Sequence, residues 1–518
     1  MQGSDVLGGR RSSVCVARRG WRARRSRDRV GHDLVERNGR LFFASEIKSL
    51  IAAGAVDREI DLHALDHYLA YLYAPPDRSM FKGVRKLPPG HVLRWREGRA
   101  ELTRFWQVGA SETFDGSAGE AARQLRTVLA DAVSSHMVSD VPLGAFLSGG
   151  VDSSIVVGLM AEASDRPVQT FSIGFDEPEF DELEHARAVA AHFHTDHHEF
   201  VVRPDGVSIL DRLIAHFDEP FADSSAIPTW YVSEVASRHV TVVLSGDGGD
   251  ELFGGYDRYV PHPRVARFDR LAVPGLRQLA SAVWPLLPHG ARGKNFLRHV
   301  ARTEDGRYLD SIAFFQPDER QALYSPDARR AINADYPDSL LMARLRRFAA
   351  LPAHGRMMRL DFETYLPEDV LAKVDRMSMA HSIESRVPLL DNHVIDFAAS
   401  LPSELKIRNG RRKHILKEAV RDLLPDGILN RRKQGFGVPL GTWFRGSLSN
   451  LLADVLSSPR ARQRGYFEPR FVERLIAEHR SGKRDHTLRL WQLMIFELWH
   501  REYLDATAGM AAAASHAR

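Results

Sequence analysis

The stretch FLSGGVDSS, residues 146–154, follows a short apolar run and decides the fold of this chain. Gly149 and Gly150 have no Cβ, so the backbone there can close around an anion with its N–H groups pointing inward. The helix expected to begin near Asp152 adds partial positive charge at its first turn. The hydroxyl donors of the loop are Ser148, Ser153 and Ser154. We interpret the stretch as a phosphate-binding turn between a strand and a helix; the alternative is a turn with only a structural role.

Strands and helices alternate around this loop. The segments expected to be strands are 143–147, 168–175, 197–202 and 240–246, and the expected helices are 119–137, 154–163, 180–193, 206–216 and 227–237. Such alternation predicts an α/β fold with a parallel sheet and right-handed crossovers. Before it, 39–46 is expected to be a strand, 47–72 a helix, and 91–95 with 101–106 a hairpin. After Tyr256 the pattern is mainly helical to about residue 505.

A second loop, VVLSGDGGDELFGGY at 242–256, also follows a β-branched strand, and it carries Asp247, Asp250 and Glu251. Ligands of open α/β sheets bind beyond the carboxyl ends of the strands, where both loops are expected to lie. Asp152 would repel phosphate unless Mg2+ lay between them, so we interpret it as a metal ligand. The first loop lacks the Gly-Lys-Ser/Thr ending of a Walker A motif. Together the loops predict a magnesium–nucleotide site; a solvated acidic turn is the alternative.

Composition narrows the class of protein. No apolar run approaches the roughly 18–20 residues that span a bilayer. The single cysteine, Cys15, excludes an internal disulfide and favours a cytoplasmic location. Residues 1–30 hold nine arginines and two aspartates, so they supply +7 of charge and leave −3 for the rest of a chain whose total is +4. The basic character therefore belongs to one terminal segment, and the remainder does not resemble a nucleic-acid binder.

Six motifs in order resemble class B, glutamine-hydrolysing asparagine synthetases. They are SGGVDSS, FSIGF, DEPFADSSAIPT, SGDGGDELFGGY, KVDRMSMAHSIESRVPLLD and RRKQGFGVPL. The resemblance implies an ATP pyrophosphatase domain (adenine nucleotide alpha-hydrolase-like) at 119–505 with a helical C-terminal part. It also implies a β-rich remnant of an N-terminal-nucleophile glutaminase domain at 33–108. We expect 1–32 to be a disordered or out-of-frame basic segment and 506–518 to be a frayed tail.

In that family ATP is cut between its α and β phosphates to activate aspartate as β-aspartyl-AMP, and ammonia then displaces AMP. The resemblance implies that Leu147 and Ile173 contact adenosine, and that Asp152 and Asp250 bind Mg2+. The residues implied to hold pyrophosphate or nucleotide are Ser148, Gly149, Gly150, Ser153, Ser245 and Gly246. The implied catalytic residues are Asp247, Lys433, Arg376 and Arg386. Structural ion pairs with Asp375 and Glu384 are the alternative for the two arginines.

The sequence departs from the family pattern in two ways. Asp247 stands where well-studied members have a glutamate, so its carboxylate reaches one methylene less far. The family's glutaminase nucleophile is a cysteine that becomes residue 1, whereas Cys15 is internal and has no free amine. We therefore expect that this chain cannot hydrolyse glutamine and uses ammonia, unless another chain supplies a glutaminase. Small molecules and a second copy of the chain are the other expected partners; nucleic acid and membrane are not.

Three other functions remain open. A relative with the same chemistry could adenylate another carboxylate, as β-lactam synthetases, peptide-cyclising enzymes and other amidotransferases do. An RNA-modifying member of the same ATPase superfamily would need a basic face, and the −3 charge beyond residue 30 argues against it. An inactive relative that only binds nucleotide is the last alternative.

Overall fold

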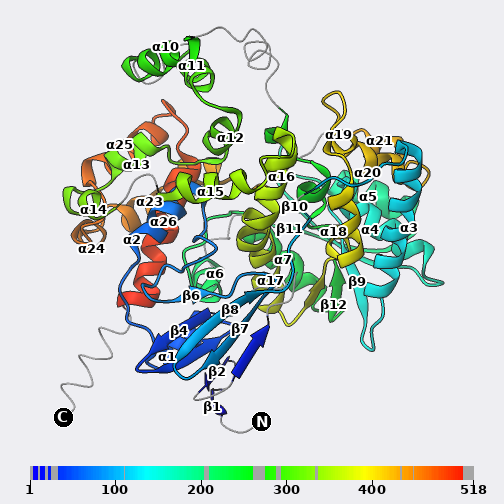
Figure 1. Ribbon diagram of the computed structural model, residues 1–518, viewed down its shortest axis with the longest axis horizontal. Coiled ribbons are helices and arrows are strands. Elements are labelled where there is room, and N and C mark those ends of the chain that lie inside the picture. The colour runs from blue at the N-terminus through cyan, green and yellow to red at the C-terminus, as the bar shows by residue number, and fades with distance from the viewer. Residues whose placement is uncertain are drawn as a thin grey trace.

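The computed structural model describes residues 4–9, 12–17, 21–24, 33–109, 111–202, 209–260, 275–287, 293–332, 336–431, 435–446 and 448–505. Before residue 33 it describes the course of the backbone only. Figure 1 shows a central sheet between helices, two antiparallel sheets at one end, and a large helical part at one side of the central sheet.

The central sheet has the order β11-β10-β9-β12-β13, and every neighbouring pair is parallel, as the sequence predicts. Its strands are β9 (Leu143–Phe146), β10 (Gln169–Phe175), β11 (Asp196–Val202), β12 (Val242–Leu244) and β13 (Glu384–Arg386). The sequence did not predict β13, which has only three residues and lies within a helical region. A strand this short has too few residues to show alternation.

Helices cover both faces of the central sheet. One face packs on α3 (Ala118–His136), α4 (Val151–Glu162) and α5 (Leu183–His192), with Ala145 and Leu244 in the shared core. The other face packs on α6 (Leu210–Phe217), α7 (Ala226–Ala236) and α17 (Leu371–Met379), with Phe171 and Val243 in that core. Burial on both faces explains why β10 is buried at all but its first position. The predicted helices of this region are therefore confirmed.

Apart from β13, the described part of the chain after β12 is mainly helical, as predicted. Its helices are α8 (Gly249–Phe253), α10 (Leu276–Val283), α11 (Lys294–Ala301), α12 (Glu304–Ile312), α13 (Pro317–Leu323), α14 (Pro326–Ala331), α15 (Tyr336–Arg347), α16 (Ala353–Glu363), α18 (Asn392–Ser400), α19 (Ser403–Lys406), α20 (His414–Ala419), α21 (Asp426–Leu429), α22 (Leu440–Arg445), α23 (Ser449–Leu456), α24 (Pro459–Gln463), α25 (Pro469–Arg480) and α26 (Thr487–His500). Shorter helical segments cover Asp257–Tyr259, Trp284–Leu286, Leu366–Val370, Pro388–Leu390 and Arg501–Asp505.

The N-terminal part forms two antiparallel sheets. One has the order β1 (Ser4–Gly9), β2 (Ser12–Ala17), β5 (Arg40–Ala44), β4 (Asp33–Arg37) and β6 (Arg85–Lys86). The other has the order β3 (Trp21–Arg24), β7 (His91–Arg96) and β8 (Arg99–Arg104). Leu41, Phe43 and Trp95 lie in one core cluster between them. The backbone thus forms strands within 4–24, where we expected no regular structure; whether 1–32 is out of frame stays a prediction.

The single helix expected over 47–72 is two helices, α1 (Ile47–Ala52) and α2 (Leu62–Tyr71). Gly54 ends the first with a left-handed φ of +68°, a conformation that glycine adopts at low cost. Asp61 begins the second, because its carboxylate accepts the backbone N–H groups of His63 at 2.9 Å and Ala64 at 3.2 Å. The hydrophobic period runs through both helices and does not reveal the break.

Helix α2 is buried among the C-terminal helices. The Tyr68 hydroxyl donates to the backbone oxygen of Gln492 at 2.7 Å, and the Gln492 amide returns a bond to the oxygen of Tyr68 at 2.8 Å. Asp66 accepts from Arg320 Nε at 2.8 Å in the same interior. The N-terminal part therefore shares its core with the end of the chain, although the Gly/Ser-rich stretch 109–119 separates them in sequence.

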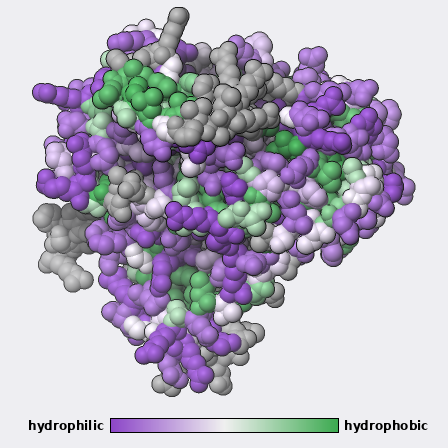
Figure 2. Space-filling view, turned by 45° about the horizontal axis from the view of Figure 1, so that its top comes forward, coloured by the Kyte–Doolittle hydropathy of each residue, from purple (hydrophilic) through white to green (hydrophobic). Residues whose placement is uncertain are grey.

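Among the described residues, no helix has both the length and the apolar composition that a bilayer crossing requires. Figure 2 shows a mainly hydrophilic face with a hydrophobic patch towards its upper left edge, where Figure 1 places α10 and α11. Leu279 and Leu286 are exposed in that region.

Candidate active site

The phosphate loop connects β9 to α4 as predicted. Gly149 has a left-handed φ of +67°, and a Cβ on it would lie 2.5 Å from the backbone carbon of His185. The amide of Gly150 donates to Ser148 Oγ at 3.3 Å, and the hydroxyls of Ser148 and Ser153 are 3.1 Å apart. These bonds hold the turn closed at the first turn of α4, whose N-terminus supplies partial positive charge.

The acidic loop connects β12 to α8 and touches the phosphate loop. A Cβ on Gly246 would lie 2.6 Å from the backbone nitrogen of Ser153, so the two loops pack backbone to backbone. Gly248 has a φ of +83°, and a Cβ there would meet Leu390 at 2.4 Å. The parallel register brings both loops to the same edge of the sheet, because β12 pairs directly with β9.

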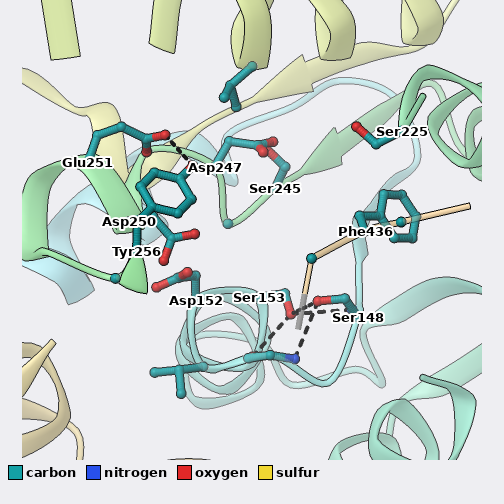
Figure 3. Close-up of a pocket in the computed structure, with 18 of the residues that line it drawn as sticks. Ser148, Asp152, Ser153, Ser225, Ser245, Asp247, Asp250, Glu251, Tyr256 and Phe436 are labelled. Carbon is teal, nitrogen blue, oxygen red and sulfur yellow. Dashed lines mark hydrogen bonds between the residues drawn. The ribbon is translucent and has the colours of Figure 1, made fainter. Parts of the chain in front are cut away.

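Asp152 and Asp250 face one another across the junction of these loops (Figure 3). The Lys413 ammonium lies between them, paired with Asp152 and 2.5 Å from Asp250 Oδ1. Burial lowers the pKa of Lys413, but the two carboxylates raise it more, so it stays charged. A Cβ on Gly255 would lie 2.3 Å from Lys413 Cε, so that glycine makes room for the lysine. The predicted metal ligands do meet, around a cation that the sequence reasoning missed.

Asp247 and Glu251 bring two further carboxylates to the same wall. The Tyr256 hydroxyl donates to Glu251 Oε1 at 2.6 Å. Burial and the nearby charge of Asp250 raise the pKa of Glu251 to about 7. Figure 3 shows Asp247 beside Ser245 in the acidic loop.

One cavity of about 1190 Å³ is bounded by both loops. The predicted residues that line it are Leu147, Ser148, Gly150, Asp152, Ser153, Ile173, Ser245, Gly246, Asp247 and Asp250. Gly149 belongs to the same loop and packs against α5. Ligand pockets usually occupy roughly 300–1,000 Å³, so this space exceeds what one small molecule needs. The cavity has room for a nucleotide and a second substrate together.

The structure does not bring Arg376 and Arg386 into this wall. Arg376, on α17, lies 2.8 Å from Glu46 and 3.5 Å from Asp218 at the contact with the N-terminal part. Arg386, on β13, pairs with Glu384 at 2.8 Å and donates to the backbone oxygen of Val138 at 2.7 Å. Arg386 thus forms the predicted pair with Glu384, whereas Arg376 forms ion pairs with other partners than Asp375, and their part in catalysis stays a prediction. Lys433 lies outside the described residues.

A buried cluster that the sequence reasoning missed lines the cavity further from the phosphate loop. Lys373 Nζ lies 2.9 Å from Asp223 Oδ2 and 2.7 Å from Ser225 Oγ. Burial raises the pKa of Asp223, but Lys373 lowers it more, to about 2. Burial and the charge of Asp223 raise the pKa of Asp369 well above its usual value, and the two carboxyl groups are hydrogen-bonded to each other.

Two sequence models of protein families match this chain. The model of asparagine synthase matches residues 124–501, which contain both loops and most of the cavity wall. The model of a glutamine amidotransferase domain matches residues 18–106. The second match begins within 1–32, the segment that we expected to lie outside any domain.

Curated relatives extend along most of the chain. "Asparagine synthetase [glutamine-hydrolyzing] 1" of Bacillus subtilis is 33% identical over 468 residues, which are 89% of this chain and 72% of that protein. "Asparagine synthetase [glutamine-hydrolyzing] 3" of the same organism is 26% identical, covering 79% of this chain and 64% of its own. "Amidase chry2" of Gibberella zeae is also 26% identical, covering 86% of this chain and 71% of its own.

Proposed function

The chain belongs to the asparagine synthase family, and on that premise we propose that it makes asparagine from aspartate, ATP and a nitrogen donor. AMP and pyrophosphate are the other products. One observation carries the proposal: a phosphate loop without a Walker lysine meets an acidic loop in a single cavity. Such a site suits cleavage between the α and β phosphates of ATP better than transfer of the γ-phosphate.

The phosphate loop binds the pyrophosphate part of ATP in this proposal. The serine hydroxyls at 148 and 153 and the backbone N–H groups at the start of α4 are the donors. Because Ser148 and Ser153 already hold each other at 3.1 Å, they need little reorganisation when the nucleotide arrives. The backbone of Leu147 and Ile173 forms the adenosine side of the cavity.

We propose that Asp152 and Asp250 would hold Mg2+, because carboxylate oxygens are ligands that this ion prefers; Lys413, which pairs with both, would have to give up part of these contacts. When bound, the ion neutralises charge on the phosphates. A Cβ on Gly249 would lie 2.4 Å from Asp152 Oδ1, so this glycine keeps the space around that carboxylate open.

The first chemical step forms an acyl-adenylate. The side-chain carboxylate of aspartate attacks the α-phosphorus, a new O–P bond forms, and the bond to the β-phosphate oxygen breaks to release pyrophosphate. We propose that Asp247 orients the reacting groups from the acidic loop and that Lys433 steadies the departing pyrophosphate. In the second step ammonia forms the C–N bond, the C–O bond to AMP breaks, and one proton leaves the nitrogen.

For this chain we propose ammonia as the nitrogen donor, or a glutaminase supplied by another chain. An N-terminal nucleophile uses its own α-amine as base. Cys15 is the one cysteine in the sequence. It is an internal residue of β2, where it pairs with Phe43 of β5, so its nitrogen is part of a peptide bond. We also propose a cytoplasmic location, which a chain with one cysteine suits.

The test is AMP formation with aspartate and ATP, comparing ammonia with glutamine, together with aspartate-dependent exchange of labelled pyrophosphate into ATP. We expect exchange with aspartate, and AMP with ammonia but not with glutamine. Absence of exchange with aspartate contradicts the choice of acceptor. Equal AMP formation from glutamine contradicts the choice of nitrogen donor, and nucleotide binding with no exchange from any acid identifies an inactive relative.

A second candidate is activation of another carboxylate by the same chemistry. The volume of the cavity favours it, since about 1190 Å³ accommodates an acceptor larger than aspartate. The exchange assay run with a panel of amino acids and dipeptides separates the two.

A further inference from the structure

Arg258 is a cation on the cavity wall that lies beyond the acidic loop. It belongs to the short helix Asp257–Tyr259, directly after Tyr256. Its guanidinium carbon lies 4.0 Å from the ring centre of Tyr256 and 4.8 Å from that of Tyr365. Two aromatic rings therefore hold the guanidinium plane in position, an arrangement that favours Arg over Lys.

Asp361 fixes the same guanidinium from the other side. Its Oδ2 accepts from Arg258 Nε at 3.2 Å and from Nη2 at 2.7 Å. Asp361 also accepts from the hydroxyl of Tyr259 at 2.7 Å and from that of Tyr308. Arg258 supplies the positive charge for this buried carboxylate, and the two phenols complete its hydrogen bonding.

The side chains of Arg258 and Asp361 differ in exposure. The Arg258 side chain is 24% exposed, whereas that of Asp361 is 2% exposed. A guanidinium has five N–H donors in a planar fork, which is more than one carboxylate takes up. Because Arg258 lines the cavity, its partly exposed side chain borders the space where substrates bind.

The surroundings decide which anion suits Arg258. Tyr256 lies between Arg258 and Glu251, because its ring stacks on the guanidinium and its hydroxyl bonds Glu251 at 2.6 Å. Arg258 is therefore joined to the acidic loop through Tyr256, and we assign it to the acceptor rather than to the phosphates. A planar guanidinium is the group that binds a carboxylate at two points.

We propose that Arg258 determines acceptor specificity by binding a second carboxylate, one that does not react, on the acid that the enzyme activates. The substrate class is then an amino acid that carries two carboxylates, one on the phosphate side of the cavity and one on Arg258. This inference rests on the proposed function and adds the group that recognises the acceptor.

The test compares two acceptors that share the reacting end. Aspartate and β-alanine both carry an amine and the carboxylate to be activated, but β-alanine lacks the second carboxylate. In pyrophosphate exchange by the wild-type protein, we expect aspartate to be favoured by about 100-fold or more in kcat/KM. Arg258→Lys should raise the KM for aspartate about 10-fold or more while the KM for ATP and the exchange with β-alanine stay within about threefold.

Arg356→Lys is the matched control. Arg356 also forms a two-point pair, with Asp305 at 2.8 and 3.0 Å, but it does not line the cavity. Thermal unfolding of both variants checks that they fold; Lys keeps a cation beside each aspartate. An Arg258→Lys variant that loses aspartate and β-alanine activity by the same factor, or neither, overturns the inference.

The outcome also separates this inference from the choice of aspartate. If aspartate supports no exchange, the same comparison uses glutamate and 4-aminobutyrate, which differ in the same carboxylate. If the protein prefers glutamate to 4-aminobutyrate and Arg258→Lys removes that preference, the role of Arg258 is supported and the assignment of aspartate as the acceptor is wrong. Absence of exchange with any acid that carries two carboxylates overturns both.

Discussion

At the scale of single residues, we expect the chemistry to depend strongly on the Asp247 side chain. It lines the cavity in the acidic loop, at a position where the family resemblance implies the longer glutamate. Asp247→Asn should lower aspartate-dependent pyrophosphate exchange by roughly 100-fold, because the neutral amide cannot orient or balance charge in the same way. Asp247→Glu should keep activity within about 10-fold, since the charge is retained and the reach increases.

Asp257→Asn is the control for this prediction, because Asp257 lies on the same segment and its side chain is 66% exposed in a pair with Arg412. Equal exchange rates in Asp247→Asn and the wild type would remove Asp247 from the mechanism.

Lys406 gives a prediction about pH. Burial and the nearby charge of Arg359 lower its pKa to about 7 from the usual 10.5. The folded state thus releases this proton more readily than the unfolded state, so stability rises with pH between 7 and 10.5 and the penalty is complete below 7. Lys406→Met should therefore raise the free energy of unfolding by roughly 2–4 kcal/mol at pH 6.5 and by much less at pH 10.

Urea unfolding of Lys406→Met and the wild type at pH 6.5, 8 and 10 measures that difference. Lys82→Met, at an exposed lysine paired with Glu59, should show little change at any of these pH values. A stabilisation by Lys406→Met that does not vary with pH would contradict the buried neutral lysine.

The sequence could identify the site residues that lie next to a glycine motif. Ser148, Asp152 and Asp250 each stand within a short loop whose pattern predicts its chemistry. Lys413, just before α20, and Lys373, on α17, could not be found in this way, because each lies far along the chain and meets its carboxylate partners only through the fold. The catalytic role predicted for Arg376 stays a prediction; the motif position did not reveal that this side chain on α17 pairs with Glu46.

At the scale of the elements, the turn from β9 to α4 depends on Gly149. A Cβ there would lie 2.5 and 2.6 Å from backbone atoms of His185 and Ala186, and backbone cannot move aside as a side chain can. The left-handed φ of +67° adds strain for any other residue. Gly149→Ala should cost about 2–3 kcal/mol of stability and should weaken ATP binding about 10-fold or more.

Gly427→Ala is the control, because that glycine lies in α21 with no atom within 4 Å of a new Cβ. Fluorescent-nucleotide titration and thermal unfolding measure the two effects. Wild-type ATP affinity in Gly149→Ala would show that the closed form of the loop is not needed for binding.

The elements themselves were predictable where the period was long. The helices on both faces of the central sheet and the Asn38-Gly39 hairpin, with φ values of 52° and 69°, follow from pattern and turn chemistry. The break between α1 and α2 was missed, because the apolar period continues from one helix into the next despite Gly54 and Asp61. Strand β13 was missed because its pairing with β12 depends on residues about 140 positions apart in sequence.

At the scale of the whole molecule, charged side chains join the N-terminal part to the synthase part. Arg376 pairs with Glu46 and with Asp218, whose side chain is 1% exposed. Arg376→Gln should lower the free energy of unfolding by about 3 kcal/mol, because it removes one of the two cations, Arg376 and Lys48, that pair with a buried carboxylate. Pyrophosphate exchange at saturating substrate should stay within about twofold, since Arg376 does not line the cavity.

Arg238→Gln, at an exposed pair with Glu234, should change stability by less than about 0.5 kcal/mol. The opposite result for Arg376→Gln, a loss of kcat at unchanged stability, would restore the catalytic role that the motif implied.

The burial of α2 among the C-terminal helices also sets an order of events during protein synthesis. Tyr68 and Gln492 exchange hydrogen bonds across 424 positions of sequence. Tyr68 therefore has no access to this partner until Gln492 has been synthesised. A growing chain on the ribosome must hold the apolar side of α2 without its final neighbours while several hundred residues are added. Contacts this distant in sequence are slow to form. We therefore expect the new chain to depend on chaperones until translation ends.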